Sequence, residues 1–240
     1  MCPPNTILPQ PTEFTGLQSL PFAVSQWLHQ AMPDINRPIQ SIKMRQQLKM
    51  MLHPGQKKWD DAHAYYAAQT HPPAFNWRAE LRLFSILKIT TLNHFENGRG
   101  NARLYCSPGL CMENEKGRKI DESSMQRFLG EMVWYPSFAC SPWVQWEELS
   151  YKVARAYFEY GGLQVYGDFY FSDNWLPEKF ITRRYYGKSN EKRSLWMTKL
   201  HHYQKHQGVL IPEGVKVYWD LGDELWYWLK IKPEEIEYQF

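Results

Sequence analysis

The stretch KVARAYFEYGGLQVYGDFYF, residues 152–171, decides the fold class. Two runs rich in aromatic and β-branched residues, which favour strands, lie on either side of Gly161-Gly162. A two-residue glycine turn suits an antiparallel hairpin, because both glycines can take a positive φ that matches the twist of the strands. The stretch therefore predicts two antiparallel strands joined by a tight turn.

Strand patterns of this kind continue on both sides of the hairpin. Apolar and polar residues alternate over residues 42–52, which predicts a strand with one buried face. Asn97-Gly98 marks a second tight hairpin. Further predicted strands cover residues 59–66, 75–83, 86–95, 102–106, 178–186, 195–203, 215–219 and 225–231. With short turns between roughly ten strands, the fold class is mainly β (α+β), with a curved antiparallel sheet.

Two segments have helical spacing instead. Apolar residues at positions 24, 27, 28 and 31 form one stripe that ends at Pro33. Residues 121–135 carry a second stripe, with Asp121 as the expected N-cap and Pro136 as the stop. Such a stripe must be buried, so we expect the sheet to wrap around one or two helices. Residues 1–19 are expected to be a flexible arm, and residues 20–240 a single domain.

Composition excludes several classes of protein. Apolar residues make up 43% and charged residues 22%, which is typical of a globular chain. The net charge of +3 is spread along the sequence, so no nucleic-acid partner is expected. The start has no secretory signal and no long apolar run follows, which predicts a cytoplasmic protein without membrane insertion. The oligomeric state is left open. Cys106 and Cys111 are either free thiols or a hairpin disulfide.

No familiar cofactor or metal motif is present. The sequence has no phosphate loop, dinucleotide fingerprint, nucleophile elbow or zincin helix, so no cofactor is expected. His201-His202-x3-His206 resembles a metal tract, but neighbouring strand residues point to opposite faces. We therefore expect no metal at these histidines.

Two groups of residues are candidates for acid/base chemistry. Asp61 and His63 share one strand face with Trp59 and Tyr65, where they could move a proton if that face meets a cavity. The alternative is that this face lies in water. Glu131, on the second predicted helix, could act in a cavity or form a structural ion pair with an arginine such as Arg99 or Arg103. The other candidate ligand-binding residues are Trp77, Trp134, Tyr135 and Trp219.

Several segments resemble an uncharacterised bacterial family of unknown function. They include residues 97–104, the Glu131–Pro136 run with its Glu-x2-Trp-Tyr-Pro pattern, residues 208–212 and residues 217–219. The resemblance implies a half-barrel similar to the lipoprotein carriers LolA and LolB, with an apolar cavity over the helices. That fold hosts lipid carriers and cofactor-free enzymes of secondary metabolism. Residues 106–118 depart from the family pattern, and the resemblance assigns no catalytic residue.

These observations support two main hypotheses. The first is a binding module that holds a small apolar or aromatic, lipid-like molecule in the half-barrel. The second is a cofactor-independent enzyme acting on an aromatic or amphipathic substrate by acid/base chemistry. The enzyme requires a titratable group that faces the cavity. A third hypothesis is an interaction protein whose own side chains fill the cavity.

Overall fold

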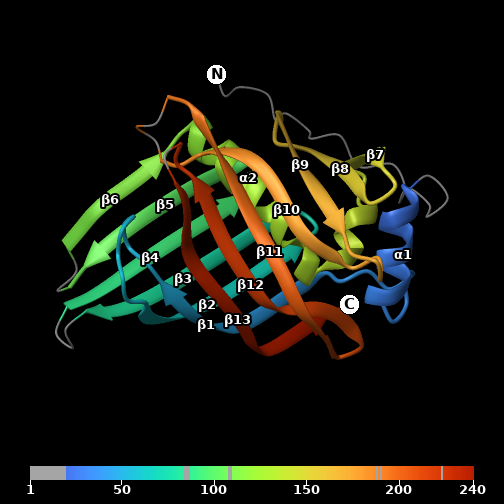
Figure 1. Cartoon of the computed structure of the whole chain (residues 1–240), viewed down its shortest axis with the longest axis horizontal. Coiled ribbons are helices and arrows are strands. Elements are labelled where there is room, and N and C mark those ends of the chain that lie inside the picture. The colour runs from blue at the N-terminus through green and yellow to red at the C-terminus, as the bar shows by residue number, and fades with distance from the viewer. Residues whose placement is uncertain (1–19, 84–86, 108–109, 188, 190, 223) are drawn as a thin grey trace, which may run out of the picture.

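The computed structural model describes residues 20–83, 87–107, 110–187, 189, 191–222 and 224–240. Within these residues, thirteen antiparallel strands form one open, curved sheet with two α-helices on its concave side (Figure 1). The predicted fold class is confirmed. The predicted arm, residues 1–19, lies outside the described residues.

The sheet is an antiparallel meander in two halves. The first half runs β1 (Ser41–Met50), β2 (Asp60–Thr70), β3 (Pro73–Leu83), β4 (Leu87–Glu96), β5 (Arg99–Cys106) and β6 (Leu110–Lys116). The second half runs β7 (Val144–Ser150), β8 (Val153–Tyr160), β9 (Leu163–Phe171), β10 (Pro177–Tyr185), β11 (Arg193–His206), β12 (Val209–Asp220) and β13 (Leu225–Gln239). The helices α1 (Phe22–Ala31) and α2 (Arg118–Glu131) precede β1 and β7, and the 3-10 turns η2 (Met132–Trp134) and η3 (Pro136–Cys140) follow α2.

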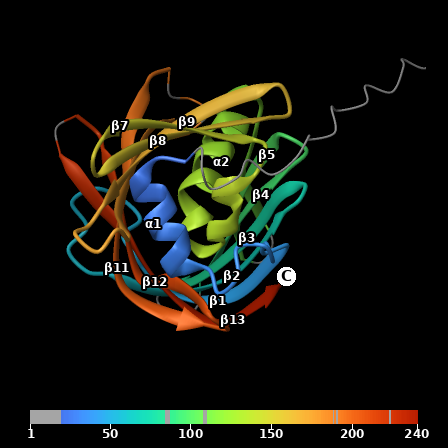
Figure 2. The same ribbon diagram turned by 90° about the vertical axis from the view of Figure 1, so that its right-hand side faces the viewer.

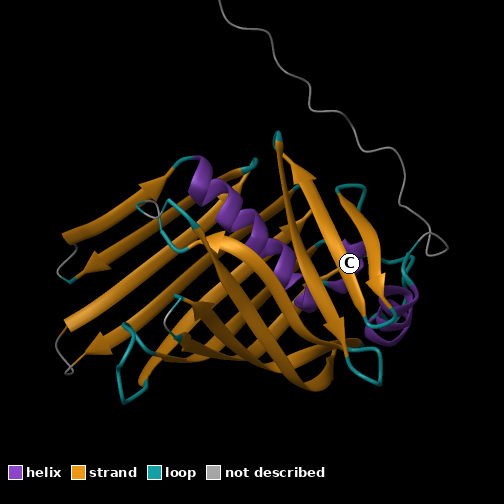
Figure 3. Ribbon diagram, turned by 45° about the horizontal axis from the view of Figure 1, so that its top comes forward, coloured by secondary structure: helices purple, strands orange, loops and turns teal. Residues whose placement is uncertain are grey.

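The two halves join where the first strand meets the last. β1 pairs with β13 along its length, from Ser41 opposite Gln239 to Met50 opposite Leu229. β6 and β7 are consequently the two free edges of the sheet. Seen end-on, the sheet curls around α1 and α2 (Figure 2). The curl makes a half-barrel, with α2 crossing its inner face (Figure 3).

The sheet curls far enough for two hairpin turns to touch. Asn97-Gly98 and Gly161-Gly162 all have positive φ, as the two predicted tight turns require. A Cβ added at Gly98 would lie 2.8 Å from the Cα of Gly161, so a side chain at either glycine would separate the turns. The rings of Phe95 and Tyr160, just behind these turns, lie 6.4 Å apart.

Both predicted helices are present, but the second has different ends. α2 begins at Arg118, three residues before the expected start at Asp121. Asp121 is therefore not the N-cap. It lies inside the first turn, where its carboxylate accepts a hydrogen bond from the Gly100 backbone N–H at 2.7 Å. The α-helix ends at Glu131, and Pro136 opens a 3-10 turn instead of ending a continuous helix.

Two strands were not predicted, and both are edge strands. β6 shows no alternation of buried and exposed residues, because nearly all of its side chains are exposed. Only the first residue of β7 is buried. An edge strand exposed on both faces lacks the period-two signal from which strands are recognised. In the described residues Cys106 and Cys111 are free thiols, so the hairpin disulfide does not form in this structure.

Candidate functional site

A cavity of about 490 Å³ lies between α2 and the concave face of the sheet. Its apolar wall comes from β3, η2, β11, β12 and β13, strands and turns that are distant in sequence. The main aromatic lining residues are Phe75, Trp77, Trp134, Trp196, Trp219, Trp226 and Trp228. Aliphatic side chains such as Leu200, Val215, Val217, Leu229 and Ile231 fill the spaces between the rings.

A β-bulge increases the aromatic area of this wall. Val217 pairs with Leu229 and Tyr218 with Tyr227, so Trp228 is an extra residue in β13. Because of this extra residue, the neighbours Trp228 and Leu229 both line the cavity. A regular strand would turn one of them to the outer face.

The cavity reaches the surface between β1 and the segment after β10. Leu52 is 39% exposed and Tyr186 is 43% exposed, and both belong to the lining. The ring of Tyr186 contacts Trp219 edge-on, with centroids 5.2 Å apart. Glu113 and Glu115 of β6 complete this rim. A small molecule could therefore enter without the half-barrel opening.

A buried ion pair lies on the helix side of the cavity. Arg127 and Glu131, one turn apart on α2, are joined by an Nε–Oε1 contact of 2.7 Å. Their side chains are 12% and 9% exposed. Arg127 also lies 4.6 Å from the centre of the Trp77 ring. With the Asn93 amide oxygen turned toward it, Arg127 donates a second hydrogen bond of 3.0 Å. The pair is thus held in a fixed position.

A second arginine lines the cavity without such a partner. Arg184 of β10 lies over two indole rings, 4.5 Å from the centre of Trp196 and 5.4 Å from that of Trp219. Its Nε is buried and has no hydrogen-bond partner. Burial, followed by repulsion from Arg127, lowers the pKa of Arg184 to about 9, while Glu131 opposes the shift. The guanidinium is still charged at neutral pH.

Several other lining side chains carry buried polar atoms without partners. Four are the indole nitrogens of Trp134, Trp196, Trp226 and Trp228. The others are Thr198 Oγ1 and Glu131 Oε2. Buried polar groups are normally hydrogen-bonded, and exceptions require an explanation. These six atoms all lie around one cavity.

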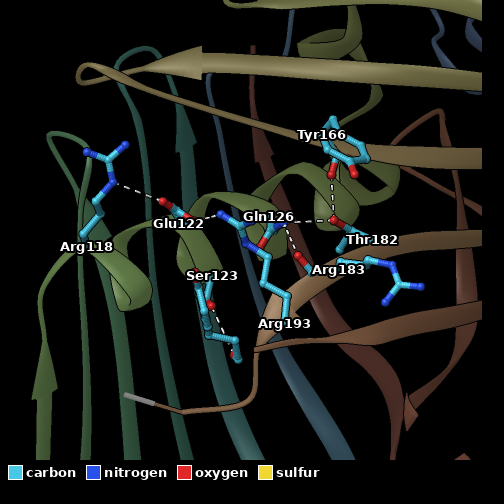
Figure 4. Close-up of polar contacts among 9 residues, drawn as sticks. Arg118, Glu122, Ser123, Gln126, Tyr166, Thr182, Arg183 and Arg193 are labelled. Carbon is cyan, nitrogen blue, oxygen red and sulfur yellow. Dashed lines mark hydrogen bonds and ion pairs between the residues drawn. The ribbon is translucent and has the colours of Figure 1, made fainter. Parts of the chain in front are cut away.

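Hydrogen bonds from α2 hold β10 in place (Figure 4). Gln126 Nε2 donates to Thr182 Oγ1 at 3.0 Å and to the Arg183 carbonyl at 2.8 Å. Ser123 donates to the Tyr185 carbonyl at 3.2 Å. At the start of the helix, Glu122 accepts hydrogen bonds from Arg118 and Arg193. One face of α2 is therefore fixed to the strand that carries Arg184.

Four of the predicted site residues line the cavity, namely Glu131, Trp77, Trp134 and Trp219. Tyr135 does not. It is fully buried in the core, where its hydroxyl donates to the Phe128 carbonyl. Arg99 and Arg103 line a separate depression over β3 to β5. The expected pairing of Glu131 with one of them is wrong, because its partner is Arg127 on the same helix.

The strand face with Asp61 and His63 does not meet the cavity. Asp61, His63 and Tyr65 are exposed on β2, and Asp61 forms an ion pair with Lys49 on the neighbouring strand. Trp59 packs edge-on against Tyr227 instead of lining the cavity. Ala62, Ala64 and Tyr66, which alternate with these residues, point inward, so Asp61, His63 and Tyr65 face water.

The histidine tract forms local contacts. His202 has a positive φ of 57°, which interrupts the strand alternation, and the rings of His201 and His202 lie 4.7 Å apart. They were predicted on opposite faces, which is wrong. His206 contacts Glu213 instead. In the described part of the chain, no group of three or more His, Cys, Asp or Glu residues could hold a metal ion.

Arg127 and Arg184 also line the cavity, although neither was predicted as a site residue. The helical spacing places Arg127 on the same face as Glu131, four residues away, but the ion pair was expected with an arginine such as Arg99 or Arg103. Arg184 also left a signal. Phe180 and Thr182 are buried on β10, and period two places Arg184 on the same face. A charged residue in an inward register is a reason to expect a site.

The chain belongs to a family of unknown function, DUF6920, whose model matches residues 18–238. The family predicted from the sequence segments is thereby confirmed. No curated protein matches the chain. Among solved structures, a LolA superfamily protein from Nitrosomonas europaea is 8% identical, with a TM-score of 0.47, covering 91% of this chain and 92% of that one.

A second similar structure is a beta-barrel-like protein of domain of unknown function DUF1849 from Brucella abortus. It is 9% identical with a TM-score of 0.35, and the match covers 85% of this chain and 100% of the other. Within the described residues, no helix is long and apolar enough to cross a membrane.

Proposed function

We propose that the protein binds a small, largely apolar or aromatic molecule in the cavity between α2 and the sheet. The observation that carries the proposal is the cavity itself, about 490 Å³ lined by indole rings and aliphatic side chains. Ligand sites are typically concave, mostly apolar and roughly 300–1,000 Å³ in volume. Burial of apolar ligand surface contributes roughly 25 cal/mol per Å². A core filled by its own side chains would leave no such space.

A pair of variants on β12 tests this proposal. Val217 lines the cavity, whereas Lys216, its neighbour, is on the other face of the strand. N-phenyl-1-naphthylamine, a neutral dye that fluoresces in apolar surroundings, is titrated into each protein. We expect Val217→Trp to weaken binding at least about tenfold, because the new ring occupies the cavity. Lys216→Trp should bind like the wild type.

Equal affinity in wild type and Val217→Trp would show that the dye binds elsewhere. Overpacking costs about 1–3 kcal/mol, so each variant is first checked for cooperative thermal unfolding. Leu200→Trp, on β11, fills the same cavity from another strand and gives an independent comparison. Native mass spectrometry of protein from its own host can then identify a copurifying molecule.

A cofactor-independent enzyme is the second candidate function, and one observation favours it. Such an enzyme needs a titratable group in the cavity, and Glu131 meets that condition, with Oε2 free of hydrogen bonds. Its other oxygen is paired with Arg127. Once a ligand is identified, each protein is incubated with it. Conversion of the ligand by wild type but not by Glu131→Gln would support catalysis. If neither protein converts the ligand, only the binding function is supported.

A further inference from the structure

We infer that the bound molecule carries an anionic group, a carboxylate, phosphate or sulfonate attached to its apolar body, and that Arg184 binds this group. The inference rests on the proposed function, because it requires a ligand in the cavity. It adds the chemical class of that ligand, an anionic amphiphile.

The balance of charge inside the cavity supports this assignment. Arg127 and Glu131 neutralise each other through their 2.7 Å contact. Arg184 is left as a positive charge with no ion-pair partner among the described residues. Arg184 is partly buried, with its Nε fully covered, and an unpaired charge withdrawn from water is expensive unless something compensates it. A ligand of opposite charge would do so.

The rim glutamates do not supply this compensation. Glu113 is exposed on β6, and Glu115 lies beside it, partly exposed. Water and salt screen charges in such positions. Among the described carboxylates, Glu131 is the one that favours the charged form of Arg184, and neither rim glutamate contributes. The uncompensated charge of Arg184 is therefore partly buried in the cavity wall, and the negative charges lie at the exposed rim.

Arg184 is presented in a way that suits an anion. The two indole rings beneath its guanidinium, Trp196 and Trp219, fix the plane of the group without using its hydrogen-bond donors. A guanidinium has five N–H donors in a fork that matches a carboxylate or phosphate. No side-chain hydrogen bond of Arg184 is formed with the described residues. A water molecule could accept one of these hydrogen bonds but could not neutralise the charge.

The remaining polar groups favour the same class of ligand. The unpartnered indole nitrogens of the lining can only donate, and among the described residues Glu131 Oε2 is the one buried carboxylate oxygen of the lining without a partner. A site rich in donors prefers a ligand rich in acceptors. A cationic ligand would meet two arginines, and a pure hydrocarbon would leave Arg184 unpaired.

The register of β10 indicates how the ligand is oriented. Tyr186, at the surface end of the cavity, is two residues beyond Arg184 and directly follows the end of β10. Two strand residues span about 7 Å, so Arg184 lies just inside the entrance. The anionic group would then lie near the entrance, with the apolar body directed toward Trp134, Leu200 and Val215.

Two dyes with one skeleton test the inference. 1-anilinonaphthalene-8-sulfonate has the rings of N-phenyl-1-naphthylamine plus a sulfonate. We expect wild type to bind the sulfonate dye more tightly than the neutral dye. Arg184→Gln should lower the affinity for the sulfonate dye by about 10–100-fold, the effect of losing a charged hydrogen bond. Affinity for the neutral dye should be unchanged or higher. Arg184→Lys should recover part of the loss.

Arg183→Gln is the matched control, because Arg183 is exposed on the opposite face of β10. It should bind both dyes like the wild type. If Arg184→Gln binds the sulfonate dye with wild-type affinity and the neutral dye still binds, the anion assignment fails and the proposed function stands. If neither dye binds the folded wild type, both fail.

Competition against the sulfonate dye separates the possible sources of the anion. Displacement by dodecanoate but not by dodecanol supports an acyl-chain ligand, and displacement by 1-naphthoate but not by naphthalene supports an aromatic acid. Displacement by inorganic phosphate at the same concentration as these amphiphiles would contradict the requirement for an apolar body.

Discussion

At the scale of single residues, the two cavity arginines differ in what holds them. Arg127 is stabilised by Glu131 and by the rings of Phe75 and Trp77. Arg184 has aromatic neighbours, but no carboxylate of the described residues pairs with it. Burial lowers the pKa of Arg184 because the protein disfavours the charged form there. This shift is a cost to the folded state at every pH below about 9, where the group is charged in both states.

Replacing Arg184 with an apolar residue should therefore stabilise the protein. We expect Arg184→Met to raise the free energy of unfolding by about 1–3 kcal/mol at neutral pH, since it removes an unpaired, partly buried charge. The gain should shrink as the pH rises through about 9, when the folded protein no longer has to hold the charge. Urea denaturation at pH 7 and pH 10 measures both values, and a loss of stability at pH 7 would contradict the explanation.

Arg127→Met should have the opposite effect. It leaves the Glu131 carboxylate buried without its partner, which typically costs about 3–5 kcal/mol. The double variant Arg127→Met, Glu131→Leu removes both charges and should recover most of the loss. Thermal unfolding of the three proteins measures the coupling, and equal melting temperatures would show that the pair contributes nothing.

The cysteines differ in reactivity at the same scale. Burial raises the pKa of the Cys140 thiol to about 11, so little thiolate forms at pH 8. Cys111 is exposed and Cys106 partly exposed. Mass spectrometry after iodoacetamide treatment at pH 8 should find Cys111 alkylated first, and Cys140 protected until denaturant is added. Fast alkylation of Cys140 in the native protein would be inconsistent with its burial.

At the scale of elements, the position of α2 decides the shape of the cavity. The helix packs on β5, β9 and β10, and Figure 3 shows it crossing the inner face of the sheet. Its contact with β5 depends on Gly100. A Cβ there would lie 2.6 Å from the Ile120 carbonyl oxygen and 2.4 Å from Ser124 Oγ. Because one of these atoms belongs to the helix backbone, the clash could be relieved only by a shift of α2 itself.

Gly100→Ala should therefore displace α2 and destabilise the protein by about 2–3 kcal/mol, the cost of overpacking a tight contact. It should also weaken binding of N-phenyl-1-naphthylamine, since α2 forms one wall of the cavity. The control is Asn101→Ala, a change at the next residue on the same strand. Its free energy of unfolding should lie within about 1 kcal/mol of the wild-type value. Wild-type stability of Gly100→Ala would show that this helix is not held tightly.

At the scale of the whole molecule, one sheet encloses the helices and its two ends remain free. β1 and β13 are central and paired on both sides, whereas β6 and β7 are edges with exposed side chains. Edge strands with few buried residues open locally at lower free energy than core strands. The curl of the sheet is limited by the touching turns at Gly98 and Gly161.

Hydrogen exchange should follow this order. Amides of residues 110–116 in β6 should exchange well before those of β1 and β13, which belong to the centre of the sheet. A bound amphiphile should slow exchange in β10 to β13 most, because these strands line the cavity. Mass spectrometry of peptic peptides measures both effects. Equal exchange in β1 and β6 would contradict the predicted order.

Local patterns allowed much of the fold to be predicted. The alternation in residues 42–50, the glycine turns and the helical stripe around Phe128 act between neighbours in the chain, so they appear in the sequence. The edge strands β6 and β7 were missed, because exposure on both faces removes that alternation. Asp61 and His63 were correctly placed on one strand face. Nothing local indicated that the face meets water.

The sequence by itself determined the hairpin of residues 152–171, the antiparallel class of the sheet and the position of two helices, because turn chemistry and periodicity are properties of adjacent residues. Only the tertiary structure decided which tryptophans line a cavity, that Glu131 pairs with Arg127, and that Arg184 has no ion-pair partner among the residues described. These facts depend on the curl that brings β10 to β13 over α2, and on a bulge at Trp228. Contacts between distant segments set burial, and burial gives the cavity its chemistry.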